Sequence, residues 1–194
     1  MPKSVVRKRS SPRKAAPRRK PSPAVRQLVL VESGYKCGNP TCRAMLTLQL
    51  HHIEWVKDGG LSDPGNLLPL CGYCHDLHTQ GRIPAEAIRV WKGILVSLSS
   101  GTPGAADLLL HLSRMQSDRF AKYFAYNAGD LLPLAPLLNA GLVHADFKRG
   151  HSGGSDGPTA SFEVRLTDRG EALVAAWKSG QGDALTAALA HTAA

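Results

Sequence analysis

The stretch that decides the fold begins with Cys37-Gly-Asn-Pro-Thr-Cys42 and ends with Cys71-Gly-Tyr-Cys74-His75-Asp76-Leu77-His78. His51-His52-Ile53, Gly59-Gly60 and Asn66-Leu67 lie between these two segments. All four cysteines and four of the eight histidines of the 194-residue chain therefore fall within 42 residues. Metal-binding side chains are concentrated where a core would otherwise be apolar, so the stretch predicts metal sites.

The four cysteines form two close pairs, which favours metal binding over four unrelated buried thiols. Thiolates are soft ligands, and tetrahedral geometry suits Zn²⁺. Four sulfurs close the coordination shell and leave no position for a substrate. We therefore predict a structural zinc ion held by Cys37, Cys42, Cys71 and Cys74, on which the folding of this segment depends.

Short secondary structure elements should surround the cysteines. Alternating leucines predict a strand over 46–51, with His51 on its polar face. A second short strand is expected at 67–70, where Pro69 restricts it to a sheet edge. Helices are expected at 24–32 and after Pro84.

The histidines need a separate explanation if sulfur fills the zinc shell. The order His-His-Ile, Gly-Gly, Asn-Leu-Leu-x-Leu, Cys-x-x-Cys-His resembles the HNH nucleases over about 40 residues. The resemblance implies a ββα-metal fold, in which a hairpin and a helix surround one divalent cation.

Residue roles follow from this resemblance. His52 would be the general base, Asn66 would orient it by hydrogen bonding across the loop, and His51 and His75 would bind the catalytic Mg²⁺ or another divalent cation. Hydrolysis would leave a 5′-phosphate. The family often has aspartate at the position of His51. His78 follows His75 by three residues, where many members have a spacing of four, so it is a third ligand, a simple helix-surface residue or a residue that contacts phosphate.

The basic charge is concentrated at the N-terminus. The formal net charge is +9, but ten of the 24 Lys and Arg residues precede residue 27, where there is no Asp or Glu. We expect residues 1–23 to form a disordered basic arm that adds salt-sensitive affinity for DNA. A solubilising extension and targeting by charge are the alternatives.

The chain beyond residue 99 predicts a second unit. Residues 100–104 resemble a linker. Beyond it, within 105–180, helices are expected at 105–115, 120–128 and 131–140, followed by a hairpin of 142–148 and 161–166 with a long tip and a last helix capped by Thr167. This order resembles a winged helix, and Leu138-Asn139-Ala140-Gly141-Leu142-Val143 with Leu166-Thr167-Asp168-Arg169-Gly170 resembles MarR-type regulators. Such a unit would bind DNA or a protein partner, and 181–194 would be a tail.

We therefore expect an α+β protein with a zinc-stabilised nuclease domain at 24–99 and a small winged-helix-like domain. The predicted function is a metal-dependent HNH endonuclease acting on DNA. The alternative is a zinc-stabilised DNA-binding or regulatory protein without nuclease activity. No apolar run is long enough to cross a bilayer, and the basic N-terminus has no apolar segment behind it, which predicts a cytoplasmic protein with no membrane partner.

Overall fold

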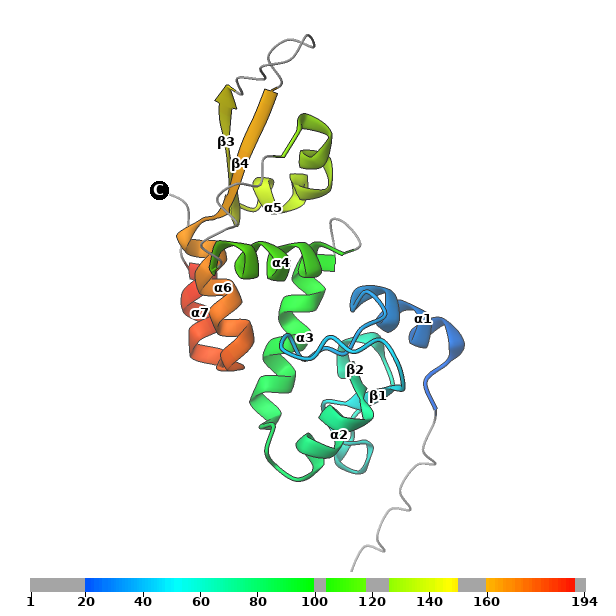
Figure 1. The fold of residues 1–194 in the computed structure, drawn as a ribbon. Helices are drawn as coiled ribbons and strands as arrows, with labels where there is room; N and C mark the ends of the chain where they lie inside the picture. Colours follow the sequence, from blue (N-terminus) through cyan, green and yellow to red (C-terminus); the bar gives the residue numbers. More distant parts are fainter. Residues whose placement is uncertain (1–19, 100–103, 118–125, 150–159, 191–194) are drawn as a thin grey trace, which may run out of the picture.

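The computed structural model describes residues 20–99, 104–117, 126–149 and 160–190. Within these residues, helices and short strands alternate (Figure 1). The elements are α1 (Pro23–Glu32), β1 (Leu48–His52), η1 (Val56–Asp58), η2 (Pro64–Asn66), β2 (Leu67–Cys71), α2 (Gly72–Thr79), α3 (Ala85–Ser99), α4 (Ala105–Ser117), η4 (Ala128–Leu134), α5 (Ala135–Asn139), β3 (Val143–Arg149), β4 (Ala160–Leu166), α6 (Asp168–Ser179) and α7 (Gly182–Ala190).

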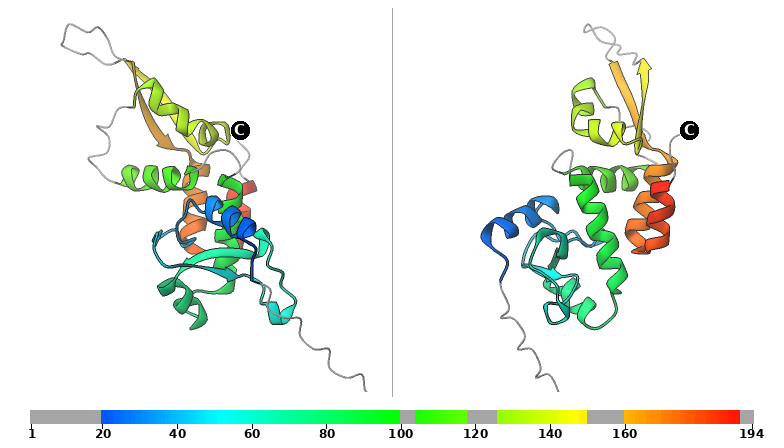
Figure 2. Two further views of the ribbon diagram at one scale, coloured as in Figure 1. Left: turned by 90° about the vertical axis from the view of Figure 1, so that its right-hand side faces the viewer. Right: turned by 180° about the vertical axis from the view of Figure 1, so that it is seen from behind.

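Helix α3 lies at the centre of the molecule (Figures 1 and 2). The segment with α1, β1, β2 and α2 covers one side of it, α6 and α7 cover the other, and α4 crosses its end. Both sides share one continuous cluster of buried apolar residues. The expected helix after Pro84 is confirmed. Its apolar residues recur at helical spacing, and they are buried by the elements that cover α3 on two sides.

Polar contacts also hold α3 in place. The indole nitrogen of Trp91 donates to the carbonyl of Trp177 at 2.9 Å. On the opposite side, Lys92 pairs with Glu32 of α1 at 2.5 Å, and both side chains are largely buried. A β-carbon on Gly180 would lie 2.4 Å from that of Ala87, so glycine permits the close approach of the end of α6 to α3.

The first strand differs from the expectation in two ways. It begins at Leu48 because Thr47 has a left-handed backbone (φ 55°), which ends the extended conformation. His51 was expected on a polar face, but its side chain is only 4% exposed. Strand alternation places His51 on the same face as the exposed Gln49, and α2 covers only the end of that face.

The two strands pair antiparallel, with His51 opposite Leu68 and Leu50 opposite Pro69. Every residue of β2 is buried. Each strand is an edge of this two-stranded sheet, which is compatible with the missing N–H of Pro69. Helix α2 follows β2 directly, so the predicted order of hairpin and helix is confirmed.

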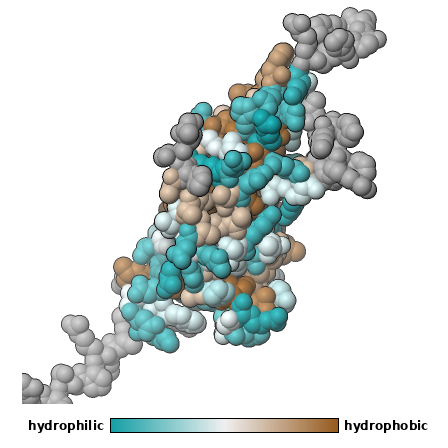
Figure 3. Space-filling view, turned by 90° about the vertical axis from the view of Figure 1, so that its left-hand side faces the viewer, coloured by the Kyte–Doolittle hydropathy of each residue, from teal (hydrophilic) through white to brown (hydrophobic). Residues whose placement is uncertain are grey.

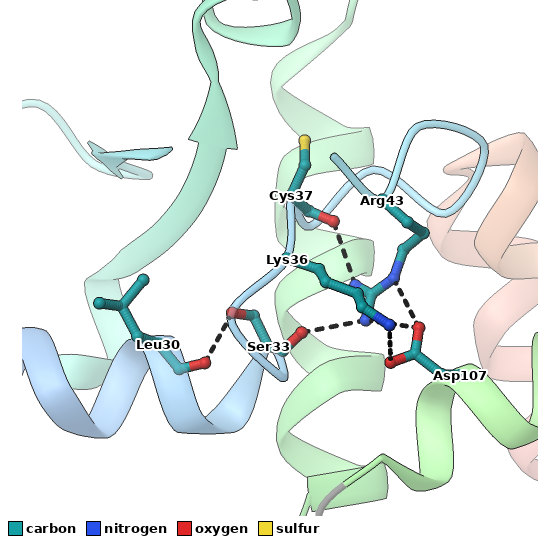
Figure 4. A network of polar contacts seen from close by, with 6 residues as sticks. All are labelled: Leu30, Ser33, Lys36, Cys37, Arg43 and Asp107. Carbon is teal, nitrogen blue, oxygen red and sulfur yellow. Dashed lines mark hydrogen bonds and ion pairs between the residues drawn. The ribbon is translucent and has the colours of Figure 1, made fainter. Parts of the chain in front are cut away.

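One arginine ties the cysteine-bearing segment to the C-terminal half (Figure 4). Arg43 donates to the carbonyls of Cys37 and Ser33 and to the carboxylate of Asp107 on α4. Lys36 bonds the other carboxylate oxygen at 2.9 Å. The Arg43 guanidinium also lies 5.8 Å from the ring centroid of Trp177 on α6, within cation–π range.

The C-terminal half contains a helix, a 3₁₀ helix that runs into a short helix, a hairpin and a capped helix. The hairpin and the helix capped by Thr167 are confirmed, and the Thr167 hydroxyl accepts from the Gly170 N–H at 3.1 Å. The expected helix at 120–128 lies mostly outside the described residues. Its last part is wrong, because Tyr126 forms a bridge with Phe162 and Asn127 caps η4. The expected helix at 131–140 is divided between η4 and α5.

The C-terminal residues contain a helix where we expected a tail. Helix α7 packs on α6 and α3 through Leu185 and Ala188. The face with α6 and α7 shows apolar residues among hydrophilic ones (Figure 3). The expected arm lies outside the described residues up to residue 19, as does the expected linker apart from Gly104. Among the described helices, none combines the length and hydrophobicity needed to cross a membrane.

Candidate metal centres and loop

The four cysteines meet in one cluster. Their sulfur atoms all lie within 4.8 Å of one another, and the sulfurs of Cys42 and Cys71 are 3.7 Å apart. None of the four forms a disulfide. Cys37 follows α1, Cys71 ends β2 and Cys74 lies in the first turn of α2, so three elements bring the ligands together.

Neighbouring groups fix the sulfurs. The Asn39 side chain donates to the Cys74 sulfur at 3.4 Å, and the Cys74 N–H donates to the Cys71 sulfur at 3.5 Å. Asn39 also accepts from the Thr41 N–H at 3.0 Å, which closes the turn between the first two cysteines. The contact of Asn39 with a cysteine sulfur was not predicted from the sequence, although its place in a Gly-Asn-Pro turn was a signal.

The cluster suits a dication, because only a cation would keep all four of these close cysteines in the thiolate form. Burial raises the pKa of Cys37 to about 11, and burial together with the neighbouring Cys37 raises that of Cys74. Burial also acts on Cys71, but hydrogen bonds from Cys74 and Cys42 lower its pKa overall. Four thiolates this close repel one another unless a cation lies between them, and Zn²⁺ supplies that charge in tetrahedral sulfur sites.

Three histidines form a second cluster. The ring centroid of His51 lies 5.3 Å from that of His75 and 4.5 Å from that of His78. Strand β1 supplies the first ring, and successive turns of α2 supply the other two. The ring of His78 thus lies nearer to that of His51 than the ring of His75 does, although His78 follows His75 by three residues and not by four.

Two observations show that this cluster offers lone pairs. The Nδ1 of His78 lies 2.8 Å from the carbonyl oxygen of Ile83. A carbonyl only accepts, so Nδ1 carries a proton, and in the neutral ring Nε2 would keep the lone pair. The Nε2 of His51 is buried without a hydrogen-bond partner. Burial and the neighbouring histidines lower the pKa of His51 to about 4, so its ring is neutral near pH 7.

His52 points away from this cluster by strand alternation and remains half-buried. Its Nε2 lies 2.9 Å from the hydroxyl of Ser62, which belongs to the loop between the strands. The contact of Ser62 with the His52 ring was not predicted, because a serine in a Ser-Asp-Pro-Gly segment indicates only a turn.

Asn66 closes the loop between β1 and β2. Its amide nitrogen donates to the carbonyls of Glu54 and Leu61, and its amide oxygen accepts from the Glu54 N–H at 2.7 Å. An amide nitrogen has two hydrogens, so both donors hold the loop rather than the His52 ring. Asn66 therefore contacts the backbone of Glu54, two residues after His52.

Gly60 is the tightest point of this loop, and we expect Gly60→Ala to destabilise it. A β-carbon at Gly60 would lie 2.0 Å from the carbonyl oxygen of Glu54, the oxygen that Asn66 bonds. Because backbone must move, the substitution should cost about 1–3 kcal/mol in the free energy of unfolding. Urea denaturation measures this change. Gly72→Ala is the control, since its β-carbon meets nothing within 4 Å. Equal stability of both variants would contradict this account of the loop.

The comparisons with known proteins agree with this geometry. A family model described as HNH endonuclease matches residues 36–81, which hold both metal-site candidates and the loop between the strands. The prediction of an HNH domain is therefore confirmed for this segment. No curated protein and no solved structure matched the chain.

Proposed function

We propose that this protein is a metal-dependent endonuclease of the HNH type that hydrolyses DNA phosphodiester bonds. The single observation that carries the proposal is the cluster of His51, His75 and His78 next to His52 within the segment that matches the HNH model. The imidazoles of His51, His75 and His78 would hold Mg²⁺ or another divalent cation together with phosphate oxygens, and imidazole suits a transition-metal ion better than Mg²⁺. Such a cation, when bound, neutralises charge on a phosphate and stabilises the departing oxygen.

The protein side chains have distinct tasks in this proposal. His52 accepts a proton from the attacking water, a role for which imidazole is suited near neutral pH. Ser62 holds the His52 ring through Nε2, and Asn66 keeps the loop closed around it. A structural zinc ion is held by Cys37, Cys42, Cys71 and Cys74. None of these cysteines forms a disulfide, which fits a reducing compartment such as the cytoplasm.

We further propose that the C-terminal half is a winged-helix-like domain. The order α4, bridge at Tyr126, α5, β3, β4 and α6 supports this, because the bridge pairs with β4 next to the hairpin. Lys148 is paired with Glu163, and Arg165 with Asp146, so the described strands present little unbalanced positive charge. This balance favours a protein partner or weak contact with DNA over strong non-specific DNA binding.

A plasmid assay separates the nuclease from the alternative of a zinc-stabilised regulatory protein. Purified protein should convert supercoiled plasmid to nicked or linear forms when Mg²⁺ or Mn²⁺ is added, and not when divalent cations are omitted. Omission is preferable to chelation, because a chelator would also remove structural zinc. Plasmid binding without any cleavage would favour the regulatory protein, and cleavage of a parallel RNA substrate alone would overturn the assignment to DNA.

Removing residues 1–21 should weaken DNA binding and flatten its salt dependence. This segment holds nine Lys and Arg residues, and each phosphate contact contributes about 0.9 to the slope of log K against log salt. The deletion stops before Ser22, whose hydroxyl caps α1 at the Val25 N–H. Fluorescence anisotropy at several salt concentrations measures the slope, and an unchanged slope would show that the arm does not contact phosphate.

A further inference from the structure

An exposed tryptophan lies beside the histidine cluster. Trp55 is 44% exposed, and its ring centroid lies 6.0 Å from that of His51 at nearly a right angle. Leu61 of the same loop is 70% exposed. Burial of such apolar side chains is favourable, so exposed ones next to a candidate reaction site need an explanation.

The position of Trp55 is fixed before any ligand binds. The N–H groups of Asp58 and Gly60 both donate to the Trp55 carbonyl, at 2.8 and 3.1 Å. Asn66 holds the adjacent Glu54 through both its N–H and its carbonyl. The loop therefore presents the indole on a fixed backbone, so binding through it would cost little conformational entropy.

Charge does not explain how this loop would hold nucleic acid. Residues 54–66 contain one basic residue, Lys57, and three acidic ones, Glu54, Asp58 and Asp63. The Lys57 ammonium lies 5.5 Å from the Trp55 ring centroid, so the single cation of the loop is held by the indole. Stacking is the other source of affinity for nucleic acid, because every base has a π-face.

We propose that Trp55 is a stacking platform for an unpaired nucleobase close to the cleaved phosphate. The 6.0 Å between the Trp55 and His51 ring centroids places a base stacked on the indole beside the proposed reaction site. A base inside a duplex is stacked on both faces and is not free to meet the indole. The preferred substrate therefore has an unpaired base there, as in a single strand, a bulge or a mismatch.

This inference rests on the proposed function for its substrate class, but its test needs no cleavage. The chain has three tryptophans, and Trp91 and Trp177 are only 4% and 0% exposed. Quenching of intrinsic fluorescence by an oligonucleotide thus reports on Trp55. We expect a single-stranded oligonucleotide to quench the His52→Ala protein, and a duplex of the same sequence to quench it much less. Equal quenching by both, or none by either, would overturn the proposal.

Variants at position 55 give a second measurement. Trp55→Ala should weaken binding of a labelled single strand by about 5- to 100-fold, and Trp55→Phe, which keeps an aromatic face, should retain most of the affinity. Leu46→Ala is the matched control, because Leu46 is an exposed apolar residue that lies two residues before the start of β1. Zinc content and thermal unfolding of each variant verify the fold. Unchanged binding by Trp55→Ala would overturn the stacking role.

The results separate this inference from the proposed function. If cleavage depends on His52 but Trp55→Ala does not change the binding of a single strand, the proposed nuclease function would stand and the stacking role of Trp55 would be wrong. Quenching of Trp55 by single strands without any cation-dependent cleavage would retain the platform and reject the nuclease.

Discussion

Replacing His52 with alanine is expected to abolish cation-dependent plasmid nicking. A positioned general base typically contributes about 10²- to 10⁴-fold to a rate, so the residual activity should fall below detection in an ordinary gel assay. Strand alternation and the contact with Ser62 keep His52 apart from the rings of His51, His75 and His78, so cation binding should persist. Zinc content and DNA affinity, measured on the same preparation, should equal those of the unmodified protein.

A histidine from another part of the chain gives the matched control. His144 lies exposed on β3 and contacts Asp146, far along the sequence from the HNH segment. His144→Ala should therefore cleave at the unmodified rate. Retained cleavage by His52→Ala would show that another group takes the proton from water, and Ser62→Ala would then reveal whether the loop contributes through its hydroxyl.

Replacing Cys37 with serine is expected to unfold the HNH segment. Serine keeps the shape of the side chain but removes a thiolate from a fully buried position. Structural zinc sites in small peptides contribute about 10–16 kcal/mol, which matches or exceeds the whole stability of a typical domain, about 5–15 kcal/mol. Elemental analysis should show zinc falling from one ion per chain to near none, with a large drop in the melting temperature.

The consequences of zinc loss should extend beyond the cysteines. Arg43 joins the Cys37 carbonyl to Asp107 and lies against Trp177, so disorder around Cys37 releases contacts to α4 and α6. Circular dichroism together with the fluorescence of the buried tryptophans would follow this. Leu46→Ser is the control, since Leu46 is exposed and lies between the cysteine pairs. Full zinc content and unchanged melting of Cys37→Ser would contradict the four-cysteine site.

Patterns that depend on neighbours in sequence were predictable. The spacing of the cysteines indicated one cluster, and the spacing of His75 and His78 indicated one helix face. Thr167 preceded a helix with acidic residues in its first turn, and the structure has that cap. The helix face and the cap are each set within a few residues of the chain. The cysteine cluster joins two distant pairs, but the spacing within each pair and the shared thiol chemistry were sufficient to indicate one site.

Features that depend on tertiary contact were not predictable. Alternation in β1 indicated a solvent-facing His51, but α2 returns to cover that end of the strand and buries the ring. The contact between Ser62 and His52 depends on the closed loop, in which Asn66 donates to the carbonyl of Leu61, next to Ser62. Helix α7 is short and rich in alanine, and it is stabilised by packing on α6 and α3, which no pattern within 182–190 reveals.

The position of α3 determines how the HNH segment could be moved into another protein. The HNH match ends at residue 81, before α3 begins, yet Cys71, Cys74 and Leu70 belong to the same apolar cluster as α3, α6 and α7. A fusion protein cut at residue 81 would lose the helix that this cluster packs against. A fusion protein that ends at residue 99 would leave Ile94 and Leu98 uncovered by α6 and α7. This exposed apolar surface would favour aggregation. The smallest unit that keeps this core intact therefore runs from α1 to α7, so the C-terminal half belongs to the structural support of the HNH segment.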